Sequence, residues 1–340
     1  MTHAVQFGVT LTQHALEQGL KKPNLGPQYS TLMTQIGVAG KLIAAQVRRA
    51  GLIEIWGTTG ETNVQGERVQ KLDQIANDTM VEVLSRSGCV NVMASEEADA
   101  LIHVKEEEQG KFNVVFDPLD GSSNIDVSIS IGTIFGIYPK VEGQSNDDQQ
   151  VLRPGREMVG AGYLVYGSST VLVYTDGQTV DSFTLDPSSG EYFLTRSDMK
   201  MPDTRTYLSI NECNAPYWPG WVHSFVAHMK GLNEGPARQV SGRHIGSLVS
   251  DFHRNLIKGG TYLYPADRRT GRGKLRLLYE GNPLAFIADV AGGDASSGEG
   301  KILSIQPESL HQRCGLVIGA KPDVTLAEAL INAAPGGANR

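Results

Sequence analysis

Cysteine is scarce in this sequence. The three cysteines, Cys89, Cys213 and Cys314, lie far apart and include neither a Cys-x-x-Cys pair nor a zinc-type spacing. This pattern excludes a disulfide framework and a cysteine-based zinc site. Isolated cysteines of this kind are typical of reduced, buried side chains, which predicts a cytoplasmic protein.

Long apolar runs and an excess of basic residues are also missing. No hydrophobic stretch reaches the ~20 residues of a membrane span, and the N-terminus has no basic segment followed by an apolar one. The 30 Lys and Arg residues are outnumbered by 37 Asp and Glu, which gives a formal net charge of −7. Nucleic acids and anionic membranes require basic surface. We therefore expect neither of them as a partner.

The chain has 340 residues, of which 40% are hydrophobic, so it can form a large core and about two domains. Helical and strand-type periodicity alternate along it without an internal repeat, which predicts an α+β or layered α/β protein. We place a boundary near residue 200. It separates an N-terminal part, residues 1–200, from a C-terminal part, residues 201–335.

The periodicity predicts individual elements along both parts. Helices are expected over residues 32–47, 69–83, 218–229 and 247–257, and from residue 275 with a kink at 282–283 and an end at 292–293. Residues 143–150 are expected to form an exposed loop. Strands are expected over residues 90–94, 114–116, 125–131, 170–174, 179–184, 192–195, 207–210 and 261–264.

The most informative stretch is Phe-Asp-Pro-Leu-Asp-Gly-Ser-Ser-Asn-Ile-Asp at residues 116–126. It follows an apolar, β-prone run, so Asp117 and Asp120 are expected at the end of a strand. Carboxylates are ligands that Mg²⁺ prefers and shares with phosphates, and the small residues 121–123 can turn backbone N–H groups toward a phosphate. The stretch therefore predicts a joint metal and phosphate site. An Asp-Pro turn followed by a serine-rich surface loop is the alternative.

Other acidic residues point to the same chemistry. Asp73 projects roughly 40° from Val69 on the helix expected over residues 69–83, which places a carboxylate on the apolar face. It needs a metal, a cation or hydrogen bonds there, unless the helix turns this face outward. Glu96 and Glu97 follow a strand, where adjacent acids are usually solvated. A cleft for two or three metals could be lined by Glu67, Asp73, Glu96, Glu97, Asp117, Asp120 and Glu280.

The 116–126 stretch resembles the defining motif of the metal-dependent, lithium-sensitive sugar phosphatase superfamily. Its form here is most similar to class I fructose-1,6-bisphosphatase. Further stretches, in the order of that family, extend the resemblance over most of the chain, from about residue 57 to residue 319. These stretches are residues 63–67, 71–73, 95–97, 130–138, 162–163, 166–170, 262–265 and 273–280.

The resemblance implies a sugar phosphatase fold, an αβαβα layered sandwich with mixed sheets. It implies hydrolysis of the 1-phosphate of fructose 1,6-bisphosphate by a metal-activated water, with two to three Mg²⁺ or Mn²⁺ ions per subunit. The product would be fructose 6-phosphate, for gluconeogenesis or carbon fixation. The implied assembly is a homotetramer in which Arg243 reaches a neighbouring site.

The family's site residues carry over to matching positions. Metals would be held by Glu67, Asp73, Glu96, Glu97, Asp117, the Leu119 carbonyl, Asp120 and Glu280. Catalysis would involve Glu97 and Asp73 as the general base, with Asp120 and Lys274. The substrate would meet Asp120, Gly121, Ser122 and Ser123 at the 1-phosphate, and Asn211, Arg243, His244, Tyr262, Leu263, Tyr264 and Lys274 at the sugar and the 6-phosphate.

The sequence departs from the family pattern at several positions. His244 stands where the family commonly has tyrosine, so one 6-phosphate contact is altered. Residues 26–31 and Phe112, which follows Lys111, differ from the family's AMP site, and the 143–150 loop has no cysteine. We therefore expect neither AMP inhibition nor thiol-based control. Two alternative functions are a phosphatase for sedoheptulose 1,7-bisphosphate and a catalytically silent sugar-phosphate sensor.

Overall fold

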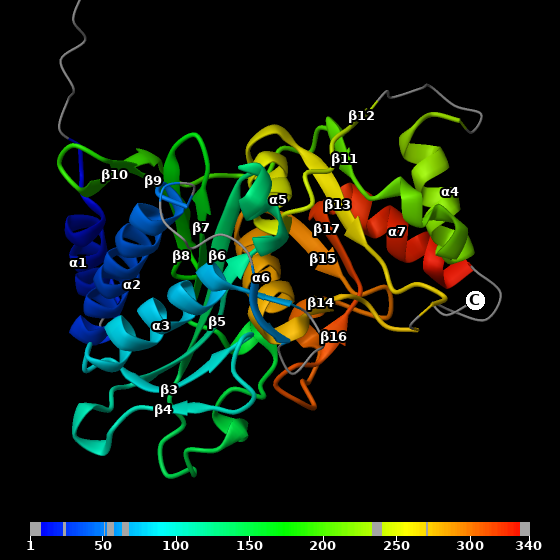
Figure 1. Ribbon diagram of the computed structural model, residues 1–340. Helices are drawn as coiled ribbons and strands as arrows, with labels where there is room; N and C mark the ends of the chain where they lie inside the picture. The colour runs from blue at the N-terminus through cyan, green and yellow to red at the C-terminus, as the bar shows by residue number, and fades with distance from the viewer. Residues whose placement is uncertain are drawn as a thin grey trace, which may run out of the picture.

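The computed structural model describes residues 8–22, 25–50, 52, 58–62, 68–232, 240–269 and 271–333. Helices and sheets alternate in layers across this part of the chain (Figure 1). One outer helical layer contains α1 (Leu11–Lys21), α2 (Gly26–Val47) and α3 (Lys71–Ser85). Among the described residues, no helix combines the length and apolarity needed to cross a membrane.

The first large sheet has eight strands in the order β10-β9-β8-β7-β6-β5-β3-β4. Only β3 and β5 pair in parallel, so the sheet is mixed. Its strands are β3 (Val90–Ser95), β4 (Ile102–His103), β5 (Phe112–Asp120), β6 (Ile131–Pro139), β7 (Gly160–Tyr166), β8 (Thr170–Thr175), β9 (Val180–Asp186) and β10 (Glu191–Arg196).

The second large sheet has five strands in the order β12-β11-β13-β17-β15 and is also mixed. Two short sheets pair β1 (Thr58–Thr62) with β2 (Arg68–Gln70), and β14 (Leu275–Arg276) with β16 (Arg313–Cys314). The boundary predicted near residue 200 falls between the two large sheets. The strands of the second large sheet are β11 (Tyr207–Ser209), β12 (Ser241–Gly242), β13 (Gly260–Tyr264), β15 (Gly293–Ser296) and β17 (Leu316–Ala320).

Helices α5 (Leu248–Lys258) and α6 (Asn282–Val290) lie between the two large sheets and contact both (Figure 1). Helices α4 (Gly220–Met229) and α7 (Lys321–Ala333) pack together on the outer side of the second sheet. The order of layers is therefore helix, sheet, helix, sheet, helix. This arrangement confirms the αβαβα sandwich with mixed sheets.

The central strands of the first sheet are buried on both faces, because helices cover each side. Every residue of β5 is buried. Val114 and Phe116 pack into the core beneath α1–α3, whereas Val115 packs toward α5 and α6. Alternation along the strand then directs Asp117 to the central layer, where the two halves of the chain meet.

Several sequence predictions about local structure were wrong. Residues 125–131 alternate apolar and polar side chains, but a 3₁₀ helix (Ser122–Val127) and a turn replace the predicted strand until β6 begins. The alternation is misleading because Val127 and Ile129 are exposed, with 64% and 41% of their surface accessible. Positive φ angles at Gly121 and Ser128 bend the chain around the intervening turn.

Two element boundaries and the exposure of one loop residue also differ from the prediction. The helix expected from residue 69 begins at Lys71, and Val69 lies in β2. The helix expected from Leu275 begins as strand β14, passes through a π-helical turn (Leu277–Gly281) and becomes α6 only at Asn282. In the loop over residues 143–150, Gln150 is fully buried instead of exposed.

Candidate active site

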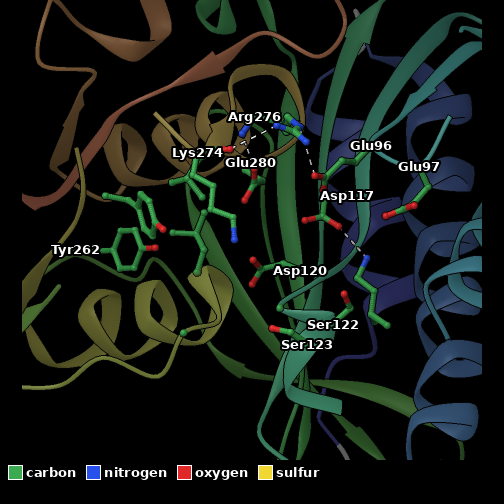
Figure 2. Close-up of a pocket in the computed structure, with 16 residues that line it drawn as sticks. Glu96, Glu97, Asp117, Asp120, Ser122, Ser123, Tyr262, Lys274, Arg276 and Glu280 are labelled. Atoms are coloured by element: carbon green, nitrogen blue, oxygen red, sulfur yellow. Dashed lines mark hydrogen bonds and ion pairs between the residues drawn. The ribbon is translucent and has the colours of Figure 1, made fainter. Parts of the chain in front are cut away.

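A cavity of about 350 Å³ opens where the first sheet, the start of α5, β13 and β14 meet. Figure 2 shows the acidic side chains gathered on one side of it, Tyr262 on the other, and Lys274 extending between them. We call these two sides the acidic end and the tyrosine end. The cavity is lined by Glu96, Glu97, Asp117, Leu119, Asp120, Gly121, Ser122, Ser123, Gly246, Leu248, Tyr262, Tyr264, Lys274, Leu275, Arg276 and Glu280.

Three buried carboxylates form the centre of the acidic end. Asp117, Asp120 and Glu280 each offer an oxygen atom, and these atoms lie within 4.8 Å of one another. Only 4%, 7% and 6% of their respective surfaces are accessible. An all-carboxylate set of this kind matches the oxygen ligands of Mg²⁺ and Mn²⁺. The structure therefore joins two acids of the 116–126 stretch to one far downstream.

Burial of these acids has an electrostatic cost. Desolvation, followed by repulsion from Glu96, raises the pKa values of Asp117 and Glu280 well above their ordinary values. Desolvation also raises the pKa of Asp120 to about 6, although hydrogen bonds to its carboxylate oppose the shift. A divalent cation between the carboxylates would neutralise this repulsion. The residues present therefore fit a metal.

Hydrogen bonds from the backbone orient each of the three carboxylates. Asp120 Oδ2 accepts bonds from the Val249 N–H at 2.8 Å and the Ser247 hydroxyl at 2.9 Å, both at the start of α5. Asp117 Oδ1 accepts a bond from the Leu119 N–H at 2.9 Å. The sequence analysis did not identify Ser247, because its contact with Asp120 spans more than a hundred residues.

Glu280 is held in the π-helical turn that precedes α6. Its Oε2 accepts a hydrogen bond from the Arg276 N–H at 2.5 Å. Single π-helical turns are frequent at functional sites, because the extra residue redirects one side chain out of the regular helix. The turn therefore explains how an acid inside the apolar run Leu277–Gly281 lines the cavity.

Arg276 is a cavity residue that the sequence analysis missed. Its side chain is almost fully buried, and its Nε lies 3.4 Å from Glu96 Oε1 (Figure 2). The available signal was a lone arginine between Leu275 and Leu277 in an apolar run. A buried guanidinium stays charged at every working pH, so it places a permanent positive charge beside the acidic end.

Glu96 and Glu97 occupy the turn that follows β3. The Glu97 N–H donates to Ser95 Oγ at 3.2 Å, and the Ser95 hydroxyl donates to Asn77 Oδ1 at 2.6 Å. These bonds tie the turn to α3. Both glutamates line the cavity, and Glu97 lies on the side of the acidic end away from Tyr262 (Figure 2).

The residues after Asp120 form a tight loop at the wall of the cavity. Gly121 adopts a φ of 79°, and a Cβ atom there would lie 2.8 Å from the Cβ of Ser247. Glycine is therefore required both by the backbone conformation and by the close approach of α5. The loop directs Ser122 and Ser123 to the cavity.

Tyr262, Tyr264 and Lys274 also line the cavity, and their contacts with a substrate stay predictions. Burial raises the pKa of Tyr262 well above its ordinary value, with smaller contributions from Asp120 and other acids. Tyr262 therefore keeps its phenolic proton at working pH. Its ring stacks on His244 with the ring centroids 6.4 Å apart.

Other predicted site residues lie away from the cavity lining. Asp73 is buried on α3, as its helical position predicted, and Asn211 lines a small neighbouring pocket with Tyr264. Leu263 is fully buried in the core between β13 and the outer helices, so only its backbone could meet a ligand. Glu67 lies outside the described residues.

Arg243 and His244 precede α5 on the segment that leads to the tyrosine end. Arg243 is exposed and donates from Nη1 to the Gly242 carbonyl at 2.8 Å. His244 Nδ1 lies 3.7 Å from Asp251 Oδ2. Neither side chain lines the cavity of a single chain, and their roles in binding stay predictions.

Two family descriptions match consecutive parts of this chain. Residues 9–197 match the family described as Fructose-1-6-bisphosphatase, N-terminal domain, and residues 201–332 match Fructose-1-6-bisphosphatase, C-terminal domain. A "Fructose-1,6-bisphosphatase class 1" from Sorangium cellulosum is 47% identical over 321 residues, covering 94% of this chain and 92% of the relative. One from Oleidesulfovibrio alaskensis is 46% identical over 330 residues, covering 95% and 98%.

A solved structure shows the same fold. The crystal structure of Leishmania major fructose-1,6-bisphosphatase in holo form superimposes with a TM-score of 0.89 at 37% identity. The match covers 96% of this chain and 99% of that one. Sequence and structure agree over nearly the full length, and this chain belongs to the class 1 fructose-1,6-bisphosphatase family.

Proposed function

We propose that this protein hydrolyses the 1-phosphate of fructose 1,6-bisphosphate in the cavity, with divalent metal at the acidic end and the sugar extending to the tyrosine end. Family membership supports the reaction, which releases fructose 6-phosphate and inorganic phosphate. One observation supports the placement: the clustered oxygens of Asp117, Asp120 and Glu280 face a cavity that also holds Lys274. The anionic substrate and the acidic wall repel each other, so cations must lie between them for the substrate to bind there.

Mg²⁺ or Mn²⁺ would be held by Asp117, Asp120, Glu280, Glu96 and the Leu119 carbonyl. When bound, such ions polarise the phosphoryl oxygens and acidify a coordinated water. A third ion, with Glu67, Asp73 and Glu97, would bring the total to three per subunit. The expected number is two to three ions per subunit.

The protein's own groups would then divide the chemistry. Glu97, supported by Asp73, takes the proton of the attacking water as general base. The Gly121, Ser122 and Ser123 loop donates hydrogen bonds to the 1-phosphate. Lys274 and Arg276 contribute positive charge near the scissile phosphate, where negative charge accumulates during transfer.

The sugar and the far phosphate would occupy the tyrosine end. Tyr264, Asn211 and Lys274 would bind the sugar and the far phosphate there. Tyr262 and the Leu263 backbone would add contacts along β13. Arg243 and His244 would complete the 6-phosphate pocket, with the arginine supplied by a neighbouring subunit of a homotetramer. Arginine suits this task because its planar fork bonds phosphate oxygens bidentately. The cytoplasmic location stays a prediction from the sequence.

A phosphate-release assay with Mg²⁺ tests the function. We expect turnover of fructose 1,6-bisphosphate to exceed that of sedoheptulose 1,7-bisphosphate and of sugar monophosphates. A higher rate on the seven-carbon substrate would favour the sedoheptulose enzyme. Binding of bisphosphate without phosphate release, with metal bound, would identify a sugar-phosphate sensor instead.

Metal-dependent stabilisation is expected to increase with pH. Below the ordinary Asp value of 3.8 the buried acids are neutral in both the folded and the unfolded chain. As pH rises through the raised folded values, about 6 for Asp120, the metal-free fold loses stability because charged carboxylates become crowded. A bound cation removes this repulsion. Melting temperatures with Mn²⁺ and with EDTA should therefore differ little near about pH 5 and clearly near about pH 8. A difference independent of pH would contradict this account.

Replacing Arg243 with alanine should weaken binding of the bisphosphate more than binding of a sugar that carries only the 1-phosphate. KM for fructose 1,6-bisphosphate is expected to rise about ten-fold or more, because a charge-assisted contact with the 6-phosphate is lost. KM for fructose 1-phosphate should stay nearly unchanged. Mixed oligomers of Arg243→Ala subunits and active-site-dead subunits should recover activity if the arginine crosses the subunit boundary. Equal losses on both substrates would contradict this placement.

A further inference from the structure

Asp251 is a fully buried acid outside the cavity, and the reaction described above gives it no role. It lies in the first turn of α5 and reaches back to the segment before the helix. Its Oδ2 accepts hydrogen bonds from the N–H groups of Ile245 at 2.9 Å and Gly246 at 3.3 Å. One carboxylate therefore holds two consecutive peptide groups at the entrance to the helix.

Arg254, one turn further along α5, extends this contact. Its Nη2 donates to Asp251 Oδ1 at 2.6 Å, to the Arg243 carbonyl at 3.1 Å and to Ser209 Oγ at 2.5 Å. The guanidinium also lies over the Tyr207 ring, 5.3 Å from its centroid. Segment 243–246 is thus fixed to α5 and to strand β11 at the same time.

The opposite side of the same helical turn holds the reacting centre. Val249 and Ser247 both donate to Asp120, one of the three clustered carboxylates. Gly246 and Leu248 line the cavity between these two sets of bonds. The first turn of α5 therefore joins the acidic end, through Asp120, to the segment that carries Arg243 and His244, through Asp251.

We propose that Asp251 is a positioning residue, which sets the distance between the far-phosphate pocket and the metal-binding carboxylates. The inference rests on the proposed function, because it assumes that the 6-phosphate meets residues 244–248 of the same chain, while Arg243 of that chain reaches the neighbouring site. A rigid spacing is needed because a bisphosphate must place both of its ends at once, and displacements of about 1 Å at a site can lower kcat/KM about a hundred-fold. Loss of Asp251 would leave two N–H groups without their acceptor and would remove one of the acceptors of the partly buried Arg254 guanidinium.

The chain contains a matched control for this residue. Asp323 is also fully buried, also lies in the first turn of a helix, and also pairs with an arginine, Arg205, and with the Thr261 hydroxyl. It sits on α7 beyond the second sheet and does not line the cavity. Asp251→Asn and Asp323→Asn therefore remove the same charge from similar surroundings, one next to the cavity segment and one away from it.

The experiment compares both variants with the wild type. Binding of fructose 6-phosphate, measured by calorimetry, reports on the far-phosphate pocket without turnover. We expect Asp251→Asn to raise its Kd, and KM for fructose 1,6-bisphosphate, about 10- to 100-fold, while kcat at saturation stays within a few-fold. Asp323→Asn should lower the melting temperature but leave Kd and KM unchanged.

Arg254→Lys serves as the second variant if Asp251→Asn does not fold. Lysine keeps the charge beside Asp251 but loses the planar guanidinium that lies over the Tyr207 ring, so a smaller rise in Kd is expected. Unchanged Kd in the folded variant, or an equal rise in Asp323→Asn, would overturn the inference. A wild type that neither binds fructose 6-phosphate nor releases phosphate would instead contradict the proposed function.

Discussion

Glu97→Gln is expected to lower kcat for fructose 1,6-bisphosphate by about two to four orders of magnitude, the usual contribution of a positioned general base. Glutamine keeps the size of the side chain and its place in the cavity but cannot accept a proton from the attacking water. Substrate binding should change little, because the contacts with the 1-phosphate come from Gly121, Ser122, Ser123 and Lys274. Phosphate release at saturating Mg²⁺, together with equilibrium binding of the substrate, would measure the two effects separately.

The control for this variant is Glu106→Gln, which makes the same chemical change on an exposed 3₁₀ turn. It should leave turnover unaltered. A Glu97→Gln enzyme with near-normal kcat would remove Glu97 from the mechanism. Asp73 would then be the next candidate base, although it lies outside the cavity lining in this structure.

Glu280→Gln should have opposite effects on activity and on the stability of the metal-free protein. Loss of one metal-binding carboxylate is expected to lower turnover about a thousand-fold or more, because metal polarisation contributes several kcal/mol to the transition state. Without metal, the same change removes a buried charge whose pKa is raised by burial and by Glu96 and Asp120. The metal-free variant should therefore melt a few degrees above wild type at about pH 8.

Melting curves with EDTA and with Mn²⁺ would test this prediction alongside phosphate release. Stabilisation by Mn²⁺ should be much smaller in Glu280→Gln than in wild type. Glu157→Gln, which removes an acid from a partly exposed ion pair with Arg153, is the control and should alter neither turnover nor the response to metal. A metal-free Glu280→Gln protein less stable than wild type would show that the carboxylate supports the fold instead of straining it.

Local sequence patterns predicted much of the fold. The strands β3, β8–β10, β11 and β13 and the helices α4 and α5 appear close to their predicted ranges, and α2 contains the helix predicted over residues 32–47 but begins earlier. Hydrophobic periodicity depends on which face of an element is buried, and that information is carried by neighbouring residues. The same reasoning placed Asp73 inside the protein, and it is buried there.

Patterns over short windows failed where the backbone left regular structure. The alternation over residues 125–131 satisfied the rule for a strand, yet Gly121 and Ser128 turn the chain and leave Val127 exposed. The π-helical turn before α6 was invisible for the same reason, because a single inserted residue does not change the apolar character of the run.

The sequence alone determined an α+β or layered α/β protein, whose αβαβα form is implied by the family resemblance. It also determined the residue types of the acidic end, since Asp117 and Asp120 sit in one contiguous motif at the end of a buried strand. Tertiary structure alone decided that Glu280 joins them, that Arg276 lies beside Glu96, and that Ser247 and Val249 hold Asp120. These contacts join residues that are far apart in the chain. They arise only when α5 and the π-helical turn pack between the two sheets, and no local pattern of side chains encodes which distant backbone N–H will face a given carboxylate.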